Sequence, residues 1–318
     1  MKRKIQAFAI LLALFSCQPG NSGKEEVLMF SYFKGNGEDG LHLAYSTDGF
    51  HFEAPGNDRP VLTPTAGRDK LMRDPCIIRG PGGKFHMVWT VSWNDRGIGY
   101  ANSDDLVHWS EQKFLPVMEH EPNARNCWAP ELFYDEKEAQ FLIFWSTTIA
   151  GLYPETEEMA DKGWDHRMYY VTTSDFVTFS ETKQFYNRGF NVIDGTLAQQ
   201  EGTYYLFMKD ETRYPPQKNL RMATAQKATG PYGEASTSIS GDYWAEGPSL
   251  DRSGNQWILY FDKYMEKKMG ALVSTDLKSW TDVSEKVSFP EGTRHGSVFV
   301  ISRDEFRTFQ EELSVENP

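Results

Sequence analysis

Four acidic residues and one histidine recur along the 318-residue chain at nearly regular intervals. Each stands beside a proline or glycine at the start of a short apolar segment. They are Asp74, Glu131, Asp194, Glu246 and His295, spaced 57, 63, 52 and 49 residues apart. Acids gathered in one small space raise one another's pKa, so a chain that needed only stability would carry apolar residues there. Two carboxyl groups across a cleft suit general acid–base chemistry, in which one activates water and the other donates a proton.

Short β-strands are the elements that must position these residues. Apolar runs rich in β-branched and aromatic residues are bounded by Gly, Asp and Asn, which is typical of strands, and helix signatures are lacking. The runs cover 84–93, 140–149, 203–208 and 256–261. After each comes a strand ending in Ser or Thr, an acidic turn and an aromatic residue, with one divergent copy. The copies close on Phe52, Trp109, Phe179, Tyr232 and Trp280.

These closing aromatic residues lie 57, 70, 53 and 48 residues apart, a period that indicates a β-propeller. Four complete units begin near Arg73, Trp128, Val192 and Trp244. The fifth is split, because 28–53 supply outer strands and 294–301 resemble an inner strand with nothing after it. We therefore expect an all-β, five-bladed β-propeller over 27–303, with one blade closed by the N- and C-terminal strands. A C-terminal tail would follow over 304–318.

Inner strands of a propeller converge on a central channel, so the five recurring residues should share one mouth. A two-sheet sandwich is the alternative fold, but its strands have no reason to repeat the turn unit. The one insertion, 151–164, lies on a loop between strands, and no linker rich in Pro or Ser interrupts 27–301.

The N-terminus has the pattern of an export signal. Three cations at 2–4 precede a short apolar run at 5–15, which is too short to span a bilayer. A signal over 1–16 that ends at Cys17, with a polar linker over 17–26, resembles a bacterial lipobox. We expect an outer-membrane lipoprotein, facing the periplasm or the cell exterior, that touches the membrane only through a lipid on Cys17. A plain secretory peptide cleaved near Ser16 is the alternative.

Composition narrows the class of partner. The net charge is −12, or about −15 without the signal, and a surface this acidic repels nucleic acid. Aromatic residues make up 14% of the chain, which favours neutral polar partners that stack on rings, such as sugars. Cys76 and Cys127 are expected to be free buried thiols, since ligand spacing for a metal is lacking.

The order of the acids resembles glycoside hydrolase family 43 over about 27–301. The resemblance is carried by Asp74 at the first inner strand, Asp194 at the third, and Glu246 before Gly-Pro at the fourth. It implies an inverting, five-bladed glycosidase acting on glycans that contain arabinose, xylose or galactose. Asp74 would be the general base, Asp194 the residue that orients the acid and modulates its pKa, and Glu246 the general acid. His295 would lie in the central channel near water or a calcium ion, and no cofactor would be required.

Two departures keep other chemistries open. Arg73 replaces the smaller residue that the family often has before its first acid, and Arg-Asp-Pro also occurs in invertase-like hydrolases, which retain configuration. Those enzymes carry an earlier Asn-Asp-Pro-Asn-Gly motif that this sequence lacks. A phosphorylase would need clustered cations, which Arg73, Arg125 and Arg294 could in principle supply.

Further residues near the expected mouth are candidates for binding substrate. Glu131 is expected to contact substrate, with a purely structural place in the channel as the alternative. Glu211 rivals Glu246 as the acid, because a loop could swing it over the site. For the tryptophans, packing between blades competes with sugar stacking. The full set of expected binding residues is Arg73, Trp93, Trp128, Glu131, Trp164, Glu211, Arg294 and His295.

The expected function is exo-acting hydrolysis of terminal arabinofuranosyl, xylosyl or galactosyl residues by inversion. The insertion at 151–164 could close one end of the channel and make a pocket. A non-catalytic glycan-binding surface lipoprotein and an invertase-like retaining glycosidase are the alternatives, and a propeller used only for protein contacts is a third. The lectin has no need of three acids at these positions.

Overall fold

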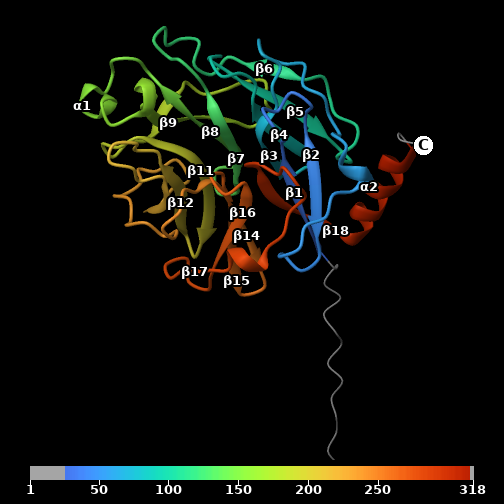
Figure 1. Cartoon of the computed structure of the whole chain (residues 1–318). Coiled ribbons are helices and arrows are strands. Elements are labelled where there is room, and N and C mark those ends of the chain that lie inside the picture. Colours follow the sequence, from blue (N-terminus) through green and yellow to red (C-terminus); the bar gives the residue numbers. More distant parts are fainter. Residues whose placement is uncertain (1–25, 316–318) are drawn as a thin grey trace, which may run out of the picture.

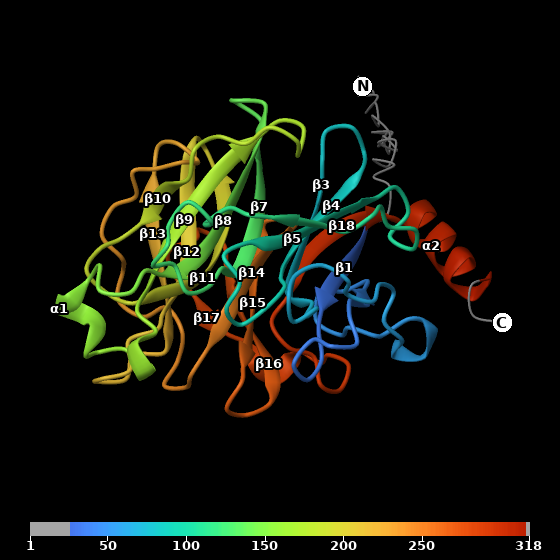
Figure 2. The ribbon, with the colours of Figure 1, turned by 90° about the horizontal axis from the view of Figure 1, so that it is seen from above.

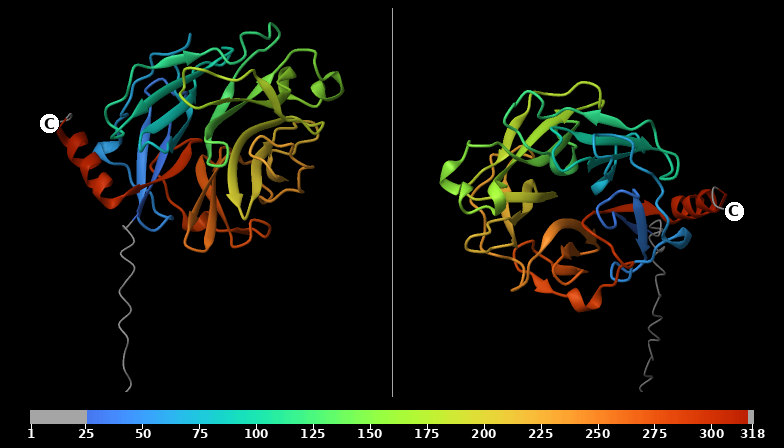
Figure 3. Two further views of the ribbon diagram at one scale, coloured as in Figure 1. Left: turned by 180° about the vertical axis from the view of Figure 1, so that it is seen from behind. Right: turned by 45° about the horizontal axis from the view of Figure 1, so that its top comes forward.

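Residues 26–315 form a ring of five antiparallel sheets around a central channel in this computed structural model (Figures 1 and 3). The sheet orders, read from the channel outward, are β18-β1-β2, β3-β4-β5-β6, β7-β8-β9-β10, β11-β12-β13 and β14-β15-β16-β17. The predicted five-bladed propeller is therefore confirmed. Only these residues are described, so the predicted signal peptide, Cys17 and all but the last residue of the linker lie outside them.

The strands fall into blades in chain order. Blade 1 comprises β3 (Arg73–Arg79), β4 (Phe85–Thr90), β5 (Ile98–Ser103) and β6 (Lys113–Leu115). Blade 2 comprises β7 (Trp128–Asp135), β8 (Gln140–Thr148), β9 (His166–Thr173) and β10 (Lys183–Tyr186). Blade 3 comprises β11 (Val192–Gln200), β12 (Thr203–Asp210) and β13 (Asn219–Ala225). Blade 4 comprises β14 (Glu246–Ser253), β15 (Gln256–Lys263), β16 (Lys268–Ser274) and β17 (Thr281–Asp282).

Blade 5 joins the two ends of the described chain. Its inner strand β18 (Ser297–Ser302) pairs with β1 (Glu26–Tyr32), which in turn pairs with β2 (His42–Ser46). The register of β1 on β18 runs from Glu26 opposite Ser302 to Ser31 opposite Ser297. This pairing confirms the predicted split blade, and it leaves the ring without a free inner edge.

The repeated acidic turn has one hydrogen-bonding pattern in four blades. At the copy that begins with Ser103, the Ser103 hydroxyl accepts the N–H of Leu106 at 2.9 Å, and Asp105 accepts the N–H of His108 at 2.7 Å. Both bonds recur in the copies that begin with Ser46 and Thr173; in the copy that begins with Ser274 the aspartate bond recurs, and the hydroxyl accepts the N–H of Asp276. The hydroxyl and the carboxylate satisfy turn N–H groups locally, which is why this residue pair recurs.

Apolar side chains fill the space between neighbouring blades. Val88 and Tyr100 of blade 1 pack in one cluster with Ile143 and Trp145 of blade 2, and all four are buried. Burial of an aliphatic side chain such as Ile143 contributes about 1.5–3 kcal/mol. These contacts fix the blades relative to one another and so fix the inner strands that form the site.

The stretch that the sequence analysis set apart as a tail contains a helix, α2 (Arg303–Val315). It lies on the outside of the ring beside β18 and β1 (Figure 2). The Ser302 N–H and the Glu305 carboxylate are hydrogen-bonded at 2.8 Å, and the Glu305 N–H donates back to the Ser302 hydroxyl, which makes a capping box. Phe306 packs on Tyr45 with ring centroids 4.6 Å apart. The expectation that the chain lacks helix signatures is wrong here.

The remaining helical pieces are short. The insertion between β8 and β9 holds α1 (Pro154–Glu157) and the 3-10 turn η2 (Asp161–Gly163), while η1 (Gly56–Asp58) and η3 (Ser284–Lys286) lie in other loops. In the part of the chain that the structure describes, no helix has the length and apolarity needed to cross a membrane.

Candidate active site

Four inner strands enter the channel through the same distortion. The pairing register shifts within β3, β7, β11 and β14. In β3, β7 and β14 the shift comes directly after the first residue of the strand, and in β11 it comes after Ile193. At each shift one residue takes the left-handed backbone conformation, with φ values of 51°, 45°, 52° and 59° at Asp74, Ala129, Asp194 and Gly247. Such bulges re-aim side chains at the end of a strand.

Aligned on these bulges, the inner strands place side chains in three successive rings. The first ring, at the mouth, is Arg73, Trp128, Ile193, Glu246 and Arg294. The second ring is Asp74, Ala129, Asp194, Gly247 and His295. The third ring, deeper in the channel, is Cys76, Glu131, Thr196, Ser249 and Ser297.

A cavity of about 260 Å³ opens at the mouth of the channel. It is lined by all of the first ring and by the three members of the second ring that have long side chains. The rest of its lining comes from Thr90, Trp93, Lys209, Glu211 and Tyr264.

The five recurring residues are therefore not equivalent, as the sequence analysis had assumed. Asp74, Asp194 and His295 share the second ring, whereas Glu246 stands one position earlier and Glu131 two positions later. Nine of the expected binding or catalytic side chains line the cavity, whereas Glu131 and Trp164 do not. The nine are Arg73, Asp74, Trp93, Trp128, Asp194, Glu211, Glu246, Arg294 and His295.

Asp74 and Asp194 are linked by one imidazole. The Nδ1 atom of His295 lies 3.4 Å from Asp74 Oδ1 and 4.0 Å from Asp194 Oδ2. The Thr90 hydroxyl donates to the other oxygen of Asp74 at 2.8 Å, and the Gly247 N–H donates to Asp194 at 3.1 Å. These contacts fix both carboxyl groups in orientation.

Burial and the neighbouring charges of opposite sign shift the pKa values of Asp194 and His295 in opposite directions. Burial raises the pKa of Asp194 to about 6, with His295 and Lys209 opposing the rise and Glu246 adding to it. Burial alone would lower the pKa of His295, but the surrounding carboxylates of Asp194 and Asp74 outweigh it and raise that pKa above its ordinary value. Both shifts favour the protonated forms of Asp194 and His295.

Glu246 is held by two cations. Lys209 Nζ lies 2.9 Å from its Oε2 atom, and Arg294 Nη2 lies 3.1 Å from its Oε1 atom. Burial alone would raise the pKa of Glu246, but Lys209 and Arg294 together hold that pKa at about 2. Arg294 also donates to Asp262 at 2.7 Å, so its position is fixed from behind.

Lys209 is the site residue that the sequence analysis missed. Its side chain is only 2% exposed, and its ammonium group sits between Glu246 and Glu211, 2.6 Å from the latter, and 4.7 Å from the centre of the Tyr264 ring. Lys218 forms a second ion pair with Glu211. Burial alone would raise the pKa of Glu211, but Lys209 and Lys218 lower it below its ordinary value. The signal available in the sequence was a lysine directly after the apolar run 203–208.

Glu131 belongs to the hydrogen-bonded interior of the channel. The Cys76 thiol and the Thr196 hydroxyl bond to its carboxyl group, and burial raises its pKa to about 7. Glu131 thus has the structural place in the channel that the sequence left open as the alternative to substrate contact. Cys76 and Cys127 are free and buried, as expected.

Aromatic rings form one wall of the cavity. Trp93 meets Trp128 edge to face with centroids 5.4 Å apart, and the ring of Trp164 packs on Trp128 with centroids 4.6 Å apart. Trp93 is 41% exposed, which leaves its ring available to a ligand.

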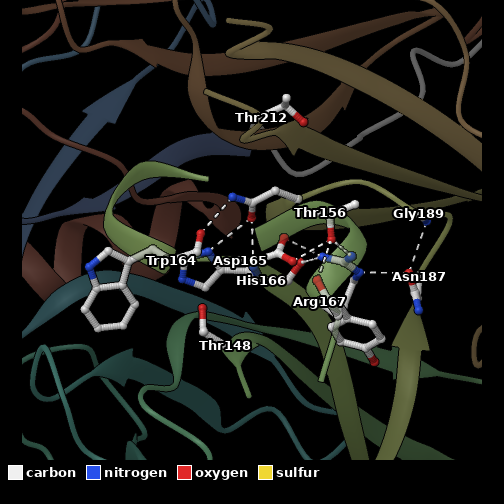
Figure 4. A network of polar contacts seen from close by, with 12 residues as sticks. Thr148, Thr156, Trp164, Asp165, His166, Arg167, Asn187, Gly189 and Thr212 are labelled. Atoms are coloured by element: carbon white, nitrogen blue, oxygen red, sulfur yellow. Dashed lines mark hydrogen bonds and ion pairs between the residues drawn. The ribbon is translucent and has the colours of Figure 1, made fainter. Parts of the chain in front are cut away.

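A buried polar network holds the insertion that carries Trp164 (Figure 4). Arg167 has no exposed side-chain surface and donates to Asp165 at 2.8 Å, to the Thr156 hydroxyl at 2.7 Å and to Asn187 at 2.8 Å. The Thr156 hydroxyl in turn donates to Asp165 at 2.6 Å. Because every partner is buried or fixed, the insertion is pinned where it meets the cavity wall.

A calcium ion at His295 stays a prediction. Within residues 26–315 no group of three or more His, Cys, Asp or Glu side chains is arranged to hold a metal. At this point the donors are one imidazole and two carboxyl groups, whereas calcium takes roughly six to eight oxygen ligands. The described residues therefore do not fit calcium.

Arginines for a phosphate site are not gathered in one place. Arg294 is neutralised by Asp262 and Glu246, and Arg125 donates to the Gly163 carbonyl outside the cavity lining. Only Arg73 of the three faces the cavity without a carboxylate partner among the described residues.

A five-bladed propeller with acids from its first, third and fourth inner strands at the channel mouth defines a class of carbohydrate-active folds. A family model described as a probable glycosyl hydrolase domain, related to glycoside hydrolase family 43, matches residues 25–307. The chain therefore belongs to the glycoside hydrolases related to family 43, a class of glycosidases.

Individual relatives are more distant. The chain is 27% identical over 184 residues to an α-L-arabinofuranosidase of Bifidobacterium longum, a match that covers 52% of this chain but only 17% of that protein. A thermostable family-43 glycoside hydrolase shares the fold with a TM-score of 0.56 and 18% identity, covering 73% of this chain and 80% of that one. An α-L-arabinofuranosidase from Lactobacillus brevis gives a TM-score of 0.51 and 18% identity, covering 66% and 72%. These matches give no support to the invertase-like or lectin alternatives.

Proposed function

We propose that the protein is an exo-acting, inverting glycosidase that removes terminal arabinofuranosyl residues, or xylosyl or galactosyl residues, from glycan side chains. The single observation that carries this proposal is the convergence of Asp74, Asp194 and Glu246 on one small cavity. The arabinofuranosidase from Bifidobacterium longum supports arabinose as the first sugar to test.

Inversion needs one ionised carboxylate and one protonated carboxyl on opposite faces of the sugar. Asp74 is the proposed base, because its orientation is fixed by Thr90 and His295 and it can receive a proton from attacking water. Asp194 is proposed to orient the acid and to keep its proton by like-charge repulsion, since it couples electrically to Glu246 and Asp74.

Glu246 is the proposed acid, and it must hold a proton to act as one. Lys209 and Arg294 oppose that proton in the arrangement described above. A sugar that enters between Glu246 and Lys209 would leave Lys209 paired with Glu211, which already lies 2.6 Å from it. Glu211 is the rival acid, and two cations pair with each of these carboxylates. Glu246 is preferred because it stands on the inner strand β14, whereas Glu211 follows β12.

The exo-acting mode is supported by the size of the cavity. About 260 Å³ is below the roughly 300–1,000 Å³ of pockets that enclose drug-sized ligands, which suits one sugar ring. The pinned insertion and its Trp164 support one wall behind Trp128 and so favour a pocket over an open groove.

We further propose export as an outer-membrane lipoprotein, facing the periplasm or the cell exterior, with a lipid on Cys17. The support is the basic start, the short apolar run and the Cys17 junction in the sequence. Metabolic labelling with a clickable palmitate, comparing the intact chain with Cys17→Ser, tests it. Equal labelling of both chains would contradict the proposal.

The activity is tested with a panel of 4-nitrophenyl glycosides. We expect release of nitrophenol from the α-L-arabinofuranoside at a higher kcat/KM than from the β-D-xylopyranoside or β-D-galactopyranoside, and loss of that release in Asp74→Ala. Lack of turnover on all three, or full activity of Asp74→Ala, would contradict the proposed function.

A further inference from the structure

Three arginines have their guanidinium groups over tryptophan rings around the cavity. The guanidinium carbon of Arg73 stands 4.5 Å from the centre of the Trp93 ring and 4.6 Å from the centre of the Phe33 ring. That of Arg125 stands 3.9 Å from the centre of Trp164. The third pair is Arg213 over Trp244 at 5.1 Å.

The three pairs come from different blades or from the loops beside them. Arg73 and Trp93 line the cavity directly. Trp164 packs on Trp128, and Trp244 lies 6.0 Å from Tyr264; both of these partners are lining residues. Arg73 comes from the start of blade 1, Arg125 precedes blade 2, and Arg213 follows β12 of blade 3.

None of the three is neutralised by a carboxylate. Among residues 26–315, Arg73 donates to the Asn36 side-chain carbonyl at 3.2 Å and Arg125 to the Gly163 carbonyl at 2.8 Å, and no ion pair within 4 Å involves Arg73, Arg125 or Arg213. The other cations of the cavity differ, since Lys209 and Arg294 each contact two carboxylates.

Arginines elsewhere in the described chain that stack on aromatic rings mostly have acidic partners. Arg79 on Phe85 pairs with Glu305, and Arg167 on Tyr153 pairs with Asp165. Arg221 on Phe190 pairs with Asp210. Near a cavity that is itself lined by four acids, the chain thus places three arginines that have no carboxylate partner within 4 Å, although its net charge is −12.

A guanidinium group that packs over a ring still presents its N–H edge to a ligand, although Arg73 and Arg125 each give one donor of that edge to Asn36 or Gly163. That edge matches the two oxygens of a carboxylate or sulfate group and can bind them with two parallel hydrogen bonds. A neutral sugar gains nothing from the charge, whereas an acidic chain as a whole repels a polyanion and needs local cations to bind one.

We propose that the mouth binds an anionic glycan, in which carboxylate or sulfate groups on the sugars flanking the cavity pair with Arg73, Arg125 and Arg213. This inference rests on the proposed function, because it names the class of polymer from which the terminal sugar is removed. The neutral sugar occupies the cavity, and the acidic backbone lies across the three Arg–Trp pairs.

The test measures the binding of polymers to the full chain carrying Asp74→Asn, by affinity gel electrophoresis in low salt. The probes are polygalacturonic acid, its carboxyl-reduced neutral form, and dextran sulfate with unmodified dextran as its neutral counterpart. We expect at least one anionic polymer to retard the protein, with the neutral counterparts at least tenfold weaker. Retardation by polygalacturonic acid alone assigns carboxylate recognition, and retardation by dextran sulfate alone assigns sulfate recognition.

The arginine changes are then compared in the same background. Arg73→Gln, Arg125→Gln and Arg213→Gln combined should weaken binding of the anionic polymer at least tenfold. Arg252→Gln is the matched control, since Arg252 stacks on Trp257 at 5.2 Å near the other end of β14. It should leave binding within twofold.

Three outcomes would overturn the inference: retardation by neither anionic polymer, equal retardation by neutral and anionic polymers, or an equal loss in Arg252→Gln and in the combined variant. Hydrolysis of the aryl arabinofuranoside by the unaltered chain reports separately on the proposed function. If the enzyme is active but does not bind anionic polymers, only the proposal of an anionic glycan is contradicted, and the proposed function stands.

Discussion

The second and third rings of the channel come from the same five strands, two residues apart, and yet they differ in chemistry. The second ring holds two acids and a histidine that face the cavity. In the third ring, side chains tie neighbouring inner strands together: Ser297 accepts the N–H of Ile77, and Ser249 accepts the N–H of Val298, both at 2.9 Å. The bulge therefore separates the reactive groups of the second ring, toward the mouth, from the structural polar groups of the third ring, deeper in the channel.

The largest effect is expected from the proposed catalytic carboxyls. Asp74→Asn and Glu246→Gln should each lower kcat by about 10³-fold, because each removes one proton transfer from the transition state. Both variants should unfold within a few degrees of the unaltered protein, measured by calorimetry. If Glu246→Gln stays active while Glu211→Gln is inactive, the acid is Glu211.

Lys209→Met should lower kcat/KM by about 10- to 100-fold and move its alkaline limb to higher pH. The charged groups that act on Glu246 include Lys209, Lys218, Arg294 and His295 on the positive side and Asp194 and Asp262 on the negative side. Loss of the lysine charge removes a cation that lowers the pKa of Glu246, so the acid keeps its proton to a higher pH.

Lys218→Met is the control for this change, since Lys218 is also buried but pairs with Glu211 alone. Its alkaline limb should move less than that of Lys209→Met, because Lys218 acts on Glu246 without forming an ion pair with it. An equal shift in both variants, or none in Lys209→Met, would remove Lys209 from the control of the acid.

Gly247→Ala should lower kcat about tenfold. A methyl group there would lie 2.3 Å from Cγ of His295, and the backbone is left-handed with φ of 59°. Gly254→Ala carries the same backbone strain, with φ of 61°, but nothing lies within 4 Å of its methyl group. Both should lose about 1 kcal/mol or more of unfolding free energy in urea, with the rate falling only in Gly247→Ala.

The smallest effect on rate is expected in the third ring. Glu131→Gln should leave kcat within about threefold, since Glu131 does not line the cavity. Its effect should appear in the free energy of unfolding, measured in urea at several pH values.

The sign of that effect follows from the pKa of Glu131, which burial raises from 4.5 to about 7. The folded state holds this proton more tightly, so the stability it gives is complete below pH 4.5 and is lost as the pH rises to about 7. Gln stays neutral, so Glu131→Gln should be about 1–2 kcal/mol more stable at pH 8. Asp194 and Asp262, both near 6, make their losses at lower pH, but His295, whose pKa is raised above 6.5, also loses stability above that pH. The test is therefore the difference between the two curves: a Glu131→Gln curve that falls between pH 6 and 7 as steeply as that of the unaltered protein would contradict this account.

The sequence predicted the ring and its closure because each blade repeats a turn whose Ser or Thr and Asp are needed locally. It also predicted most of the cavity, since inner strands of a propeller must converge. It missed the order of the rings, because a bulge shifts side chains by a residue without changing the repeat period. Aligning the Pro or Gly that directly follows each second-ring residue, at Pro75, Pro130, Gly195, Pro248 and Gly296, would have separated Glu131 from Asp74.

Lys209 could not be assigned from its neighbours in the sequence. Its partner Glu246 lies 37 residues away, and only the packing of blade 3 against blade 4 brings the two together. The helix α2 was predictable, because Ser302 and Glu305 have the spacing of a capping box and Phe306, Phe309 and Leu313 fall on one face.

The measurement that tests the central claim most directly is the stereochemistry of the first product. Proton NMR follows an aryl α-L-arabinofuranoside, or whichever glycoside of the panel the enzyme cleaves, before the free sugar mutarotates. If Asp74 activates water opposite Glu246, the anomer of inverted configuration appears first. Initial formation of the retained anomer would contradict the account and would make one of the carboxyls a nucleophile.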